Sequence, residues 1–289
     1  MSILVNQDTR LVVQGVTGRE GQFHTLRNRA YGTNVVAGVT PGKAGQDVDG
    51  IPVFNTVRDA VEATGANTSM IFVPPRFAPD AIYESLGAGI DLTIAITEGI
   101  PAHEMMRIYT HLKRGDQQLL GPNCPGAISP GKATVGIMPT DVFAPGRVGI
   151  ISRSGTLTYQ ISKEIGDLGI GQSTVVGIGG DAIVGSSFID ILQKFEDDPE
   201  TDLVVMVGEI GGDEEEKAGA FISANMTTPV VGYIAGFQAP AGKQMGHAGA
   251  IITGSSGTAQ GKKDALEAMG VEVGTNPTEV AQIVSRRLG

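Results

Sequence analysis

A histidine held between glycines is the side chain of this sequence best suited to chemistry. His247 lies in KQMGHAGAI (residues 243–251), where Gly246 and Gly249 flank it. The glycines of this segment disfavour a regular helix. We therefore expect the imidazole to lie on a loop that is able to move. An imidazole of near-neutral pKa on such a loop suits nucleophilic or acid–base catalysis. An ordinary loop histidine is the plainer alternative.

A second candidate is the carboxylate that ends a very apolar run. Glu209 follows LVVMVG (residues 203–208). If it lies near His247, it accepts a hydrogen bond from one ring nitrogen and leaves the other nitrogen nucleophilic. A strand-end carboxylate that faces solvent is the alternative. Together the two residues predict covalent or acid–base chemistry on a histidine.

Two turns have the composition of anion-binding turns. Gly15, Gly18 and Gly21 in QGVTGREGQF permit a tight turn that leaves the N–H groups of the next helix pointing at a phosphate. Their spacing is GxxGxxG instead of GxGxxG, and a glycine turn shaped by packing is the alternative. In SRSGTLT (residues 152–158), Ser154 and Thr156 either belong to an anion site or form a plain helix cap.

A lysine stands where dinucleotide-binding folds carry an acidic, ribose-binding residue. Lys43 in GVTPGK occupies this place after the next apolar run. A cation there favours a ligand with an extra phosphate, such as the 3′-phosphate of coenzyme A or the 2′-phosphate of NADP. Ile96, Thr97 and Glu98 end another run, so we expect them to line the same edge as Gly18 and Lys43.

Repeated short apolar runs supply the scaffold that brings these residues together. Each run is rich in β-formers, closes with Gly or Pro and precedes a stretch of helical spacing. They predict strands over residues 11–15, 34–39, 70–75, 92–99 and 118–122, and then over 147–155, 172–181, 203–212 and 229–236. In an open parallel sheet the carboxyl ends of the strands lie along one edge, where α/β proteins bind ligands. The predicted fold class is α/β.

The length of 289 residues suits two such units. Pro and Gly become dense between residues 121 and 146, and no helical period survives there. We therefore place one domain at residues 1–122 and a second, with its own site, at residues 123–289.

Charge and composition exclude several classes of protein. Lys and Arg number 21 against 31 Asp and Glu, a net charge of −10 without a basic run, which disfavours nucleic-acid binding. No apolar run approaches the roughly 18 residues of a membrane span, and no signal sequence is evident, so we expect no membrane association. Cys124 is the single cysteine and cannot form an internal disulfide, which indicates a reducing, cytoplasmic compartment.

The sequence contains no P-loop. The segment GTAQGKK (residues 257–263) has three residues between its glycines instead of four, and Lys263 stands where Ser or Thr is required. If ATP is used, we expect a second chain to bind it. We expect no metal site in this chain.

Eight motifs in order make the chain resemble the α subunit of succinyl-CoA synthetase (succinate–CoA ligase, ADP- or GDP-forming). They span essentially the whole chain and read GxTGxxG, GVTPGK, ITEGIP, GPNCPG, GIISRSGTLTY, GIGGD, GEIGG and GHAGAI. The resemblance implies an N-terminal Rossmann-like CoA-binding domain followed by a flavodoxin-like, parallel-sheet CoA-ligase domain. It also implies a β subunit of ATP-grasp fold that binds ATP/ADP or GTP/GDP with Mg²⁺.

The resemblance implies a role for each candidate residue. His247 is the phosphorylated histidine, Glu209 orients it, and Tyr159 contacts the acid substrate. The implied CoA contacts are Thr17, Gly18, Arg19, Glu20, Lys43, Ile96, Thr97 and Glu98, and the implied phosphate contacts are Ser154, Gly155 and Thr156. Many members have Gln where this chain has Glu20, which adds a negative charge beside an anionic ligand.

The implied activity is the reversible, nucleotide-dependent ligation of succinate and CoA through a phosphohistidine and an acyl phosphate. This is a substrate-level phosphorylation of the tricarboxylic acid cycle. Malate–CoA ligase and the C-terminal part of ATP-citrate lyase resemble the same motifs, so a malate–CoA ligase α subunit is one alternative. A CoA-binding regulatory module without catalysis is the alternative of a different class.

Overall fold

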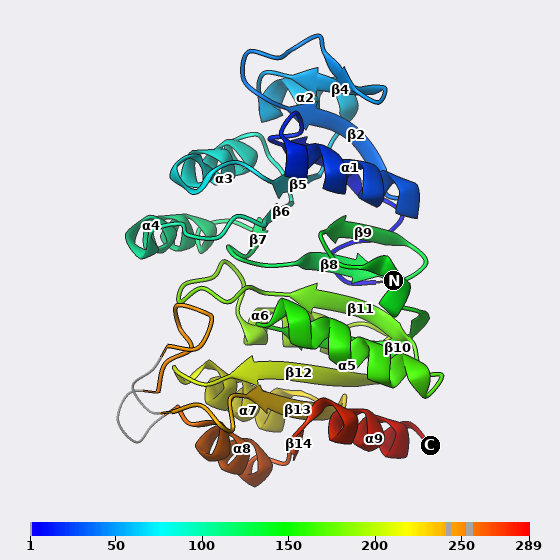
Figure 1. Ribbon diagram of the computed structural model, residues 1–289, viewed down its shortest axis with the longest axis vertical. Helices are drawn as coiled ribbons and strands as arrows, with labels where there is room; N and C mark the ends of the chain where they lie inside the picture. Colours follow the sequence, from blue (N-terminus) through cyan, green and yellow to red (C-terminus); the bar gives the residue numbers. More distant parts are fainter. Residues whose placement is uncertain (1, 241–243, 253–256) are drawn as a thin grey trace.

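The structure is a computed structural model that describes residues 2–240, 244–252 and 257–289. Figure 1 shows two α/β parts arranged along the long axis, the N-terminal half in blue to cyan above and the remainder in green to red below. The described residues form two sheets of seven strands each. The predicted α/β fold class is confirmed.

The first sheet has the strand order of a Rossmann fold. Its order is β3-β4-β2-β1-β5-β6-β7, and every pair is parallel except the β3–β4 hairpin. Without β3 this is the 3-2-1-4-5-6 order of dinucleotide-binding domains, which bind ligands where the order reverses, beside the end of β1. The strands are β1 (Arg10–Gln14), β2 (Asn34–Val39), β3 (Asp47–Val48), β4 (Ile51–Phe54), β5 (Thr68–Ile71), β6 (Leu92–Ala95) and β7 (Gln118–Leu120).

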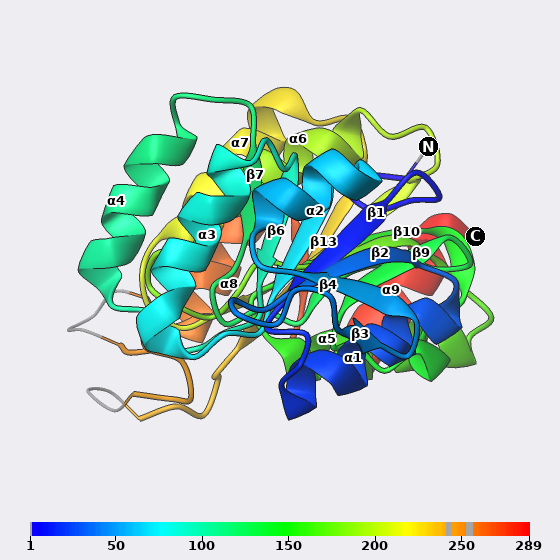
Figure 2. The same cartoon turned by 90° about the horizontal axis from the view of Figure 1, so that it is seen from above.

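Helices cover both faces of this sheet. Helix α1 (Arg19–Tyr31) lies on one face, and α2 (Val57–Thr64), α3 (Ala78–Gly87) and α4 (Ala102–Leu112) lie on the other (Figure 2). A short 3-10 turn, η1 (Pro75–Phe77), precedes α3. Helix α2 ends, as predicted, at Gly65, whose φ of 66° is left-handed and favours glycine.

The second sheet joins a flavodoxin-like order to a hairpin. Its order is β14-β13-β12-β10-β11-β8-β9, in which β8 pairs antiparallel with β11 and with β9, and the other pairs are parallel. The five parallel strands follow the order 2-1-3-4-5. The strands are β8 (Gly126–Ser129), β9 (Ala133–Gly136), β10 (Pro145–Ser152), β11 (Gln172–Gly177), β12 (Leu203–Glu209), β13 (Val230–Ala235) and β14 (Glu272–Gly274).

Its helices again lie on both faces, so β11 and β12 are buried along their whole length. Helices α5 (Gly155–Asp167) and α9 (Pro277–Leu288) pack together on one face. The other face carries α6 (Phe188–Glu196), α7 (Glu214–Asn225) and α8 (Ala259–Ala268). The 3-10 turn η2 (Thr140–Val142) precedes β10.

The Pro- and Gly-rich segment 121–146, where we predict the domain boundary, holds the β8–β9 hairpin. Glycine is needed here for close backbone pairing: a Cβ atom added at Gly126 would lie 2.1 Å from the carbonyl oxygen of Val135. All nine predicted strands are present, generally ending before the Gly or Pro turn that we included. The prediction omits β3, β4, β8, β9 and β14, which are short strands with little apolar periodicity.

The C-terminal end of α1 is fastened to this hairpin. The buried side chain of Asn28 donates to the carbonyl oxygen of Gly136 at 2.8 Å and accepts from its N–H at 3.1 Å. Thr33 Oγ1 exchanges a similar pair of hydrogen bonds with the backbone of Thr134, at 2.7 and 2.9 Å. Helix α1 therefore connects two strands of the first sheet, β1 and β2, while its C-terminal end contacts the second sheet.

Candidate active site

Two strand ends of the second sheet meet at the point where its strand order reverses. Strands β10 and β12 are parallel neighbours, with Ser152 opposite Val207. Ser154 and Glu209 therefore stand at the same level, each two residues beyond that pair. This is the edge at which a doubly wound sheet binds ligands.

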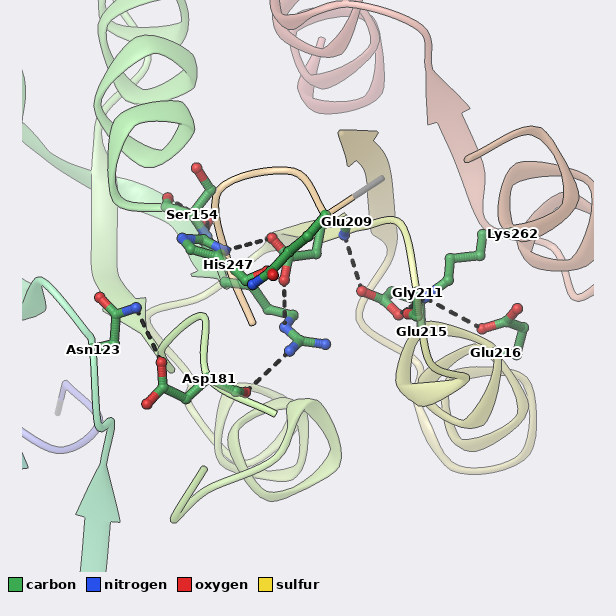
Figure 3. A network of polar contacts seen from close by, with 12 residues as sticks. Asn123, Ser154, Asp181, Glu209, Gly211, Glu215, Glu216, His247 and Lys262 are labelled. Carbon is green, nitrogen blue, oxygen red and sulfur yellow. Dashed lines mark hydrogen bonds and ion pairs between the residues drawn. The ribbon is translucent and has the colours of Figure 1, made fainter. Parts of the chain in front are cut away.

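The structure brings His247 to Glu209, as predicted. His247 Nδ1 lies 2.6 Å from Glu209 Oε2, and the Glu209 side chain is only 6% exposed (Figure 3). A carboxylate can only accept, so Nδ1 carries the proton and Nε2 keeps its lone pair. The hydrogen bond with Glu209 raises the pKa of His247 above its ordinary value, although burial opposes the shift.

Arg153 completes this group on the other side of the carboxylate. Its Nε lies 3.4 Å from Glu209 Oε1, and both side chains are more than nine-tenths buried. At that distance the contact is an ion pair without a well-directed hydrogen bond. Our sequence interpretation missed Arg153, although it stands between the two serines of the SRSG turn and is the only cation of that motif.

The turn after β11 contacts the ring of His247. A Cβ atom added at Gly180 would lie 2.4 Å from the His247 ring, so the ring packs directly on this backbone. The next residue, Asp181, accepts a hydrogen bond from Asn123 Nδ2 at 3.1 Å, and its carbonyl oxygen accepts one from Arg153 Nη2 at 3.3 Å. Asp181 was also missed; its signal is the acidic residue that closes GIGGD at a strand end.

The N-terminus of α5 faces the same edge. Ser154 is its N-cap, and Ser154 Oγ accepts from the N–H of Leu157 at 3.3 Å, so the cap interpretation is correct for this side chain. The N–H groups of Gly155 and Thr156 belong to the first turn, whose amides have no partner within the helix and favour an anion. The proposed phosphate contacts thus lie on backbone that is suited to the task.

Tyr159 lies one turn further along α5. Its ring packs edge-on against Phe143, with 6.4 Å between the ring centroids. Burial raises the pKa of Tyr159 to about 12, so its hydroxyl stays protonated and can donate a hydrogen bond. Its contact with an acid substrate remains a prediction.

A buried ion pair supports the strand end that carries Glu209. Glu215 Oε1 accepts from the N–H of Glu209 at 3.0 Å, and Lys262 forms an ion pair with the same carboxylate. Lys262 Nζ also donates to the carbonyl oxygen of Gly211 at 2.6 Å, and both charged side chains have no exposed surface (Figure 3). The lysine of the P-loop-like segment is therefore a structural residue without access to a ligand.

A second candidate site lies at the switch point of the first sheet. It is a pocket of about 870 Å³, large enough for an extended ligand of nucleotide size. A Cβ atom added at Gly21 would lie 2.2 Å from the carbonyl oxygen of Gly15, so this glycine is required by the tight turn. The lining includes Gln14, Gly15, Thr17, Gly18, Arg19, Glu20, Thr40, Phe72, Val73, Phe77 and Glu84.

Four of the eight predicted CoA contacts line this pocket, namely Thr17, Gly18, Arg19 and Glu20. Arg19 Nε lies 2.9 Å from Glu20 Oε1, so the added negative charge of Glu20 is paired with a neighbouring cation at the exposed rim. The sequence analysis did not single out Gln14, Thr40, Phe72 and Phe77. Gln14 and Thr40 lie within the QGVTGREGQF and GVTPGK motifs, whereas Phe72 and Phe77 lie outside the motifs.

The other four predicted contacts are not part of the pocket lining. Lys43 is exposed on the turn that follows β2. Thr97 Oγ1 donates to the carbonyl oxygen of Val73 at 2.8 Å, which places the turn containing Ile96, Thr97 and Glu98 directly beside the pocket wall. Their contacts with CoA stay predictions.

Two family models cover most of the chain. One described as "CoA binding domain" matches residues 6–99, and one described as "CoA-ligase" matches residues 151–272. Succinate–CoA ligase [ADP-forming] subunit alpha 2 of Archaeoglobus fulgidus is 57% identical over 288 residues, which is 100% of both chains. The chain belongs to the succinate–CoA ligase α-subunit family.

Other relatives of this succinate–CoA ligase α subunit differ in the acid that they are named for. Malate–CoA ligase subunit alpha of Methylorubrum extorquens is 52% identical over 294 residues, covering 99% of each chain. A solved structure of ATP citrate lyase from Methanothrix soehngenii in complex with citrate and coenzyme A superposes with a TM-score of 0.86 at 24% identity. It matches 99% of this chain and 51% of the lyase chain, and it shows that the fold is shared.

The remaining groups of this α subunit offer little further chemistry. Burial raises the pKa of the Cys124 thiol to about 12, which keeps it protonated and unsuited to act as a nucleophile. Among the residues that the structure describes, no group of three His, Cys, Asp and Glu side chains could hold a metal ion. Within the same residues, no helix is long and apolar enough to cross a membrane.

Proposed function

We propose that this chain acts as the α subunit of a succinate–CoA ligase and carries the activated phosphoryl group on His247. The contact of 2.6 Å between His247 Nδ1 and Glu209 Oε2 carries the proposal, because it leaves Nε2 as the nucleophile. The full-length match to an ADP-forming succinate–CoA ligase α subunit supports this reaction over that of a CoA-binding module without catalysis.

The chemistry follows from the inertness of a carboxylate toward a thiol. Nε2 of His247 attacks the γ-phosphorus of a nucleoside triphosphate, and the bond to the diphosphate breaks. Glu209 holds the Nδ1 proton and stabilises the positive charge that develops on the ring. A carboxylate oxygen of succinate then takes the phosphoryl group, and the CoA sulfur displaces phosphate to give the thioester. Every step is reversible.

The N-terminus of α5 is the proposed phosphate site during these transfers. The backbone amides of Gly155 and Thr156, with the cap residue Ser154, present partial positive charge next to the His247 loop. Tyr159, one turn later and protonated, is the proposed contact for the acid substrate.

The first-sheet pocket is the proposed CoA site. Its match to a CoA-binding family model supports this assignment, as does the tight Gly15–Gly21 turn that brings backbone amides of α1 to the rim. Thr17, Gly18, Arg19 and Glu20 border the pocket, and Lys43, Ile96, Thr97 and Glu98 are proposed to contact parts of CoA that extend beyond it.

The nucleotide is proposed to bind to a second subunit. Lys262 is fully buried in an ion pair, so the P-loop-like segment cannot receive a phosphate chain. We propose a β subunit of ATP-grasp fold that binds ATP/ADP or GTP/GDP with Mg²⁺ and delivers the γ-phosphoryl group to His247. We also propose residues 1–122 and 123–289 as the two domains, and a cytoplasmic location on the basis of the free thiol Cys124.

A labelling experiment tests the proposed function. The complex with the β subunit is incubated with ATP labelled at the γ-phosphate, and we expect acid-labile, base-stable label on this chain. His247→Asn is expected to remove the label and net ligation while CoA binding stays intact. Label that persists in this variant, or that lies on another residue, would refute the phosphohistidine. A panel of succinate, malate and citrate as acids decides the substrate, with succinate expected to react fastest.

A further inference from the structure

Asp181 connects the proposed CoA site with the phosphohistidine site. Its Oδ1 accepts a hydrogen bond from Asn123 Nδ2 at 3.1 Å. The N–H of Asn123 donates to the carbonyl oxygen of Thr97 at 3.0 Å, and the N–H of Gly180 donates to the carbonyl oxygen of Asn123 at 3.1 Å. Asn123 therefore joins the strand end with the proposed CoA contacts to the turn that carries Asp181.

The other side of the same turn touches the histidine. The His247 ring packs on Gly180, and Arg153 Nη2 donates to the carbonyl oxygen of Asp181. Asp181 also borders a small pocket of about 200 Å³ whose lining includes Arg153. The carboxylate thus lies between Thr97, which is proposed to contact the part of CoA that extends beyond its pocket, and His247, which is proposed to carry the phosphoryl group.

The Asp181 carboxylate is available as a base. Within the described part of the chain, Asn123 is its only side-chain hydrogen-bond donor and Oδ2 has no such partner. Burial, followed by the negative charge of Glu98, raises the pKa of Asp181, while Asn123, His247 and Arg153 oppose the shift. Tyr109 and Glu214 are the other titratable side chains, besides Arg153, that line the small pocket with Asp181.

We propose that Asp181 is the general base that removes the proton from the CoA thiol, an inference that rests on the proposed function. The S–H bond breaks as the proton moves to a carboxylate oxygen of Asp181. The sulfur forms a bond to the carbonyl carbon of the succinyl phosphate, and the bond from that carbon to the phosphate oxygen breaks. Inorganic phosphate leaves, and Asp181 returns its proton to solvent. In the reverse reaction the protonated acid reprotonates the sulfur.

The other candidate bases near this point are already committed or unsuitable. Glu209 is held between Arg153 and His247, and the His247 ring is the proposed phosphoryl carrier. Glu98 is exposed to solvent, and the Cys124 thiol is buried and protonated. A thiol with an ordinary pKa of about 8.5 is only a few per cent ionised at neutral pH, so a base accelerates its attack.

The test separates thiol activation from the earlier steps. The αβ complex carries either the native chain or Asp181→Asn, which keeps the acceptor oxygen for Asn123. Three quantities are measured: ³²P label on His247 from ATP, succinyl phosphate trapped with hydroxylamine in the absence of CoA, and the rate of succinyl-CoA formation. Asp116→Asn, an exposed carboxylate beyond α4, is the control.

We expect label and trapped acyl phosphate to stay within about twofold of the native complex. Thioester formation at pH 7 should fall by about 10²- to 10⁴-fold, the usual contribution of a general base. The deficit should shrink as the pH approaches about 8.5, because the thiol then ionises without help. Asp181→Glu keeps the carboxylate and should restore at least about a tenth of the native rate.

Three results would overturn the assignment: equal loss of label and thioester, a deficit that does not change with pH, or an Asp181→Glu variant no better than Asp181→Asn. The first of these would make Asp181 a support for His247 alone. Absence of label from the native complex would instead refute the proposed function, so the two failures are distinguishable.

Discussion

Replacing Glu209 with Gln removes one negative charge from the centre of the catalytic group and leaves its shape nearly unchanged. In the native site, Glu209 Oε2 accepts the Nδ1 proton of His247 at 2.6 Å, and the carboxylate is almost fully buried. A hydrogen bond to a charged group contributes about 1.5 to 3 kcal/mol. If this contribution is made in the transition state for phosphorylation, the rate falls by about 10- to 150-fold.

The same substitution changes the dependence on pH. The hydrogen bond with Glu209 raises the pKa of His247, so the folded site stabilises the protonated ring. That stabilisation is complete below the ordinary pKa of His247 and is lost as the pH rises through the raised value. The neutral ring is the nucleophile, so native phosphorylation weakens as the pH falls through the raised pKa. In Glu209→Gln this acid limb should move to lower pH, even though the maximal rate is smaller.

The assay is a single-turnover quench-flow measurement of ³²P transfer from ATP to the αβ complex across a range of pH. Glu62→Gln, on the exposed face of α2, is the matched control and should behave as the native chain. The substitution also leaves the buried Arg153 without its partner charge, so a decrease of about 3 to 5 kcal/mol in the free energy of unfolding should accompany it. An unchanged acid limb together with a native rate would show that Glu209 does not act on His247.

Three further substitutions probe the two sites and their support. Lys43→Glu should weaken CoA binding by about 10- to 150-fold, the effect of a lost charge-assisted hydrogen bond plus repulsion, as measured by calorimetry; native affinity would remove Lys43 from the site. In Gly21→Ala the new Cβ would lie 2.2 Å from the carbonyl oxygen of Gly15, so the turn must open and CoA affinity should fall more than about tenfold, with His247 labelling from ATP retained. Lys262→Met strands the buried carboxylate of Glu215 and should lower the free energy of unfolding by about 3 to 5 kcal/mol in chemical denaturation. The double variant with Glu215→Leu should recover most of that loss, and a double variant as unstable as the single one would contradict the ion-pair explanation.

Much of the fold follows from local signals in the sequence. The runs that form β1, β10 and β12 are apolar on both faces because helices cover both sides of their sheets, and that pattern is visible without a structure. The Gly15 turn and the Ser154 cap are equally local, since a tight turn and a helix start each depend on a few neighbouring residues. The sequence shows that His247 and Glu209 are suitable partners, but it cannot show that they meet, because 38 residues separate them.

The residues that were missed act through contacts between distant segments. Asp181 acquires its environment from Asn123, which is 58 residues away in the chain, and Arg153 acquires its role from Glu209. The β8–β9 hairpin was obscured because glycines that permit close strand pairing also resemble a linker. In each of these cases the neighbouring sequence fits more than one structure, and contacts with distant residues decide which one forms.

The hydrogen bonds between the end of α1 and β9 make this helix a spacer of fixed length between the two sheets. Its first turn borders the proposed CoA pocket, and Asn28, nine residues from Arg19 and so a rise of about 14 Å along the helix, is hydrogen-bonded to the hairpin. A hydrogen-bonded helix keeps its length, so the distance between its first turn and the hairpin contact is fixed. In the proposed mechanism, the remaining distance is covered by the pantetheine arm of CoA from one side and by His247 from the other. Thioester formation should therefore depend on the length of the pantetheine arm. An analogue of CoA that is one methylene shorter should still bind the pocket, but its sulfur should not reach the acyl group.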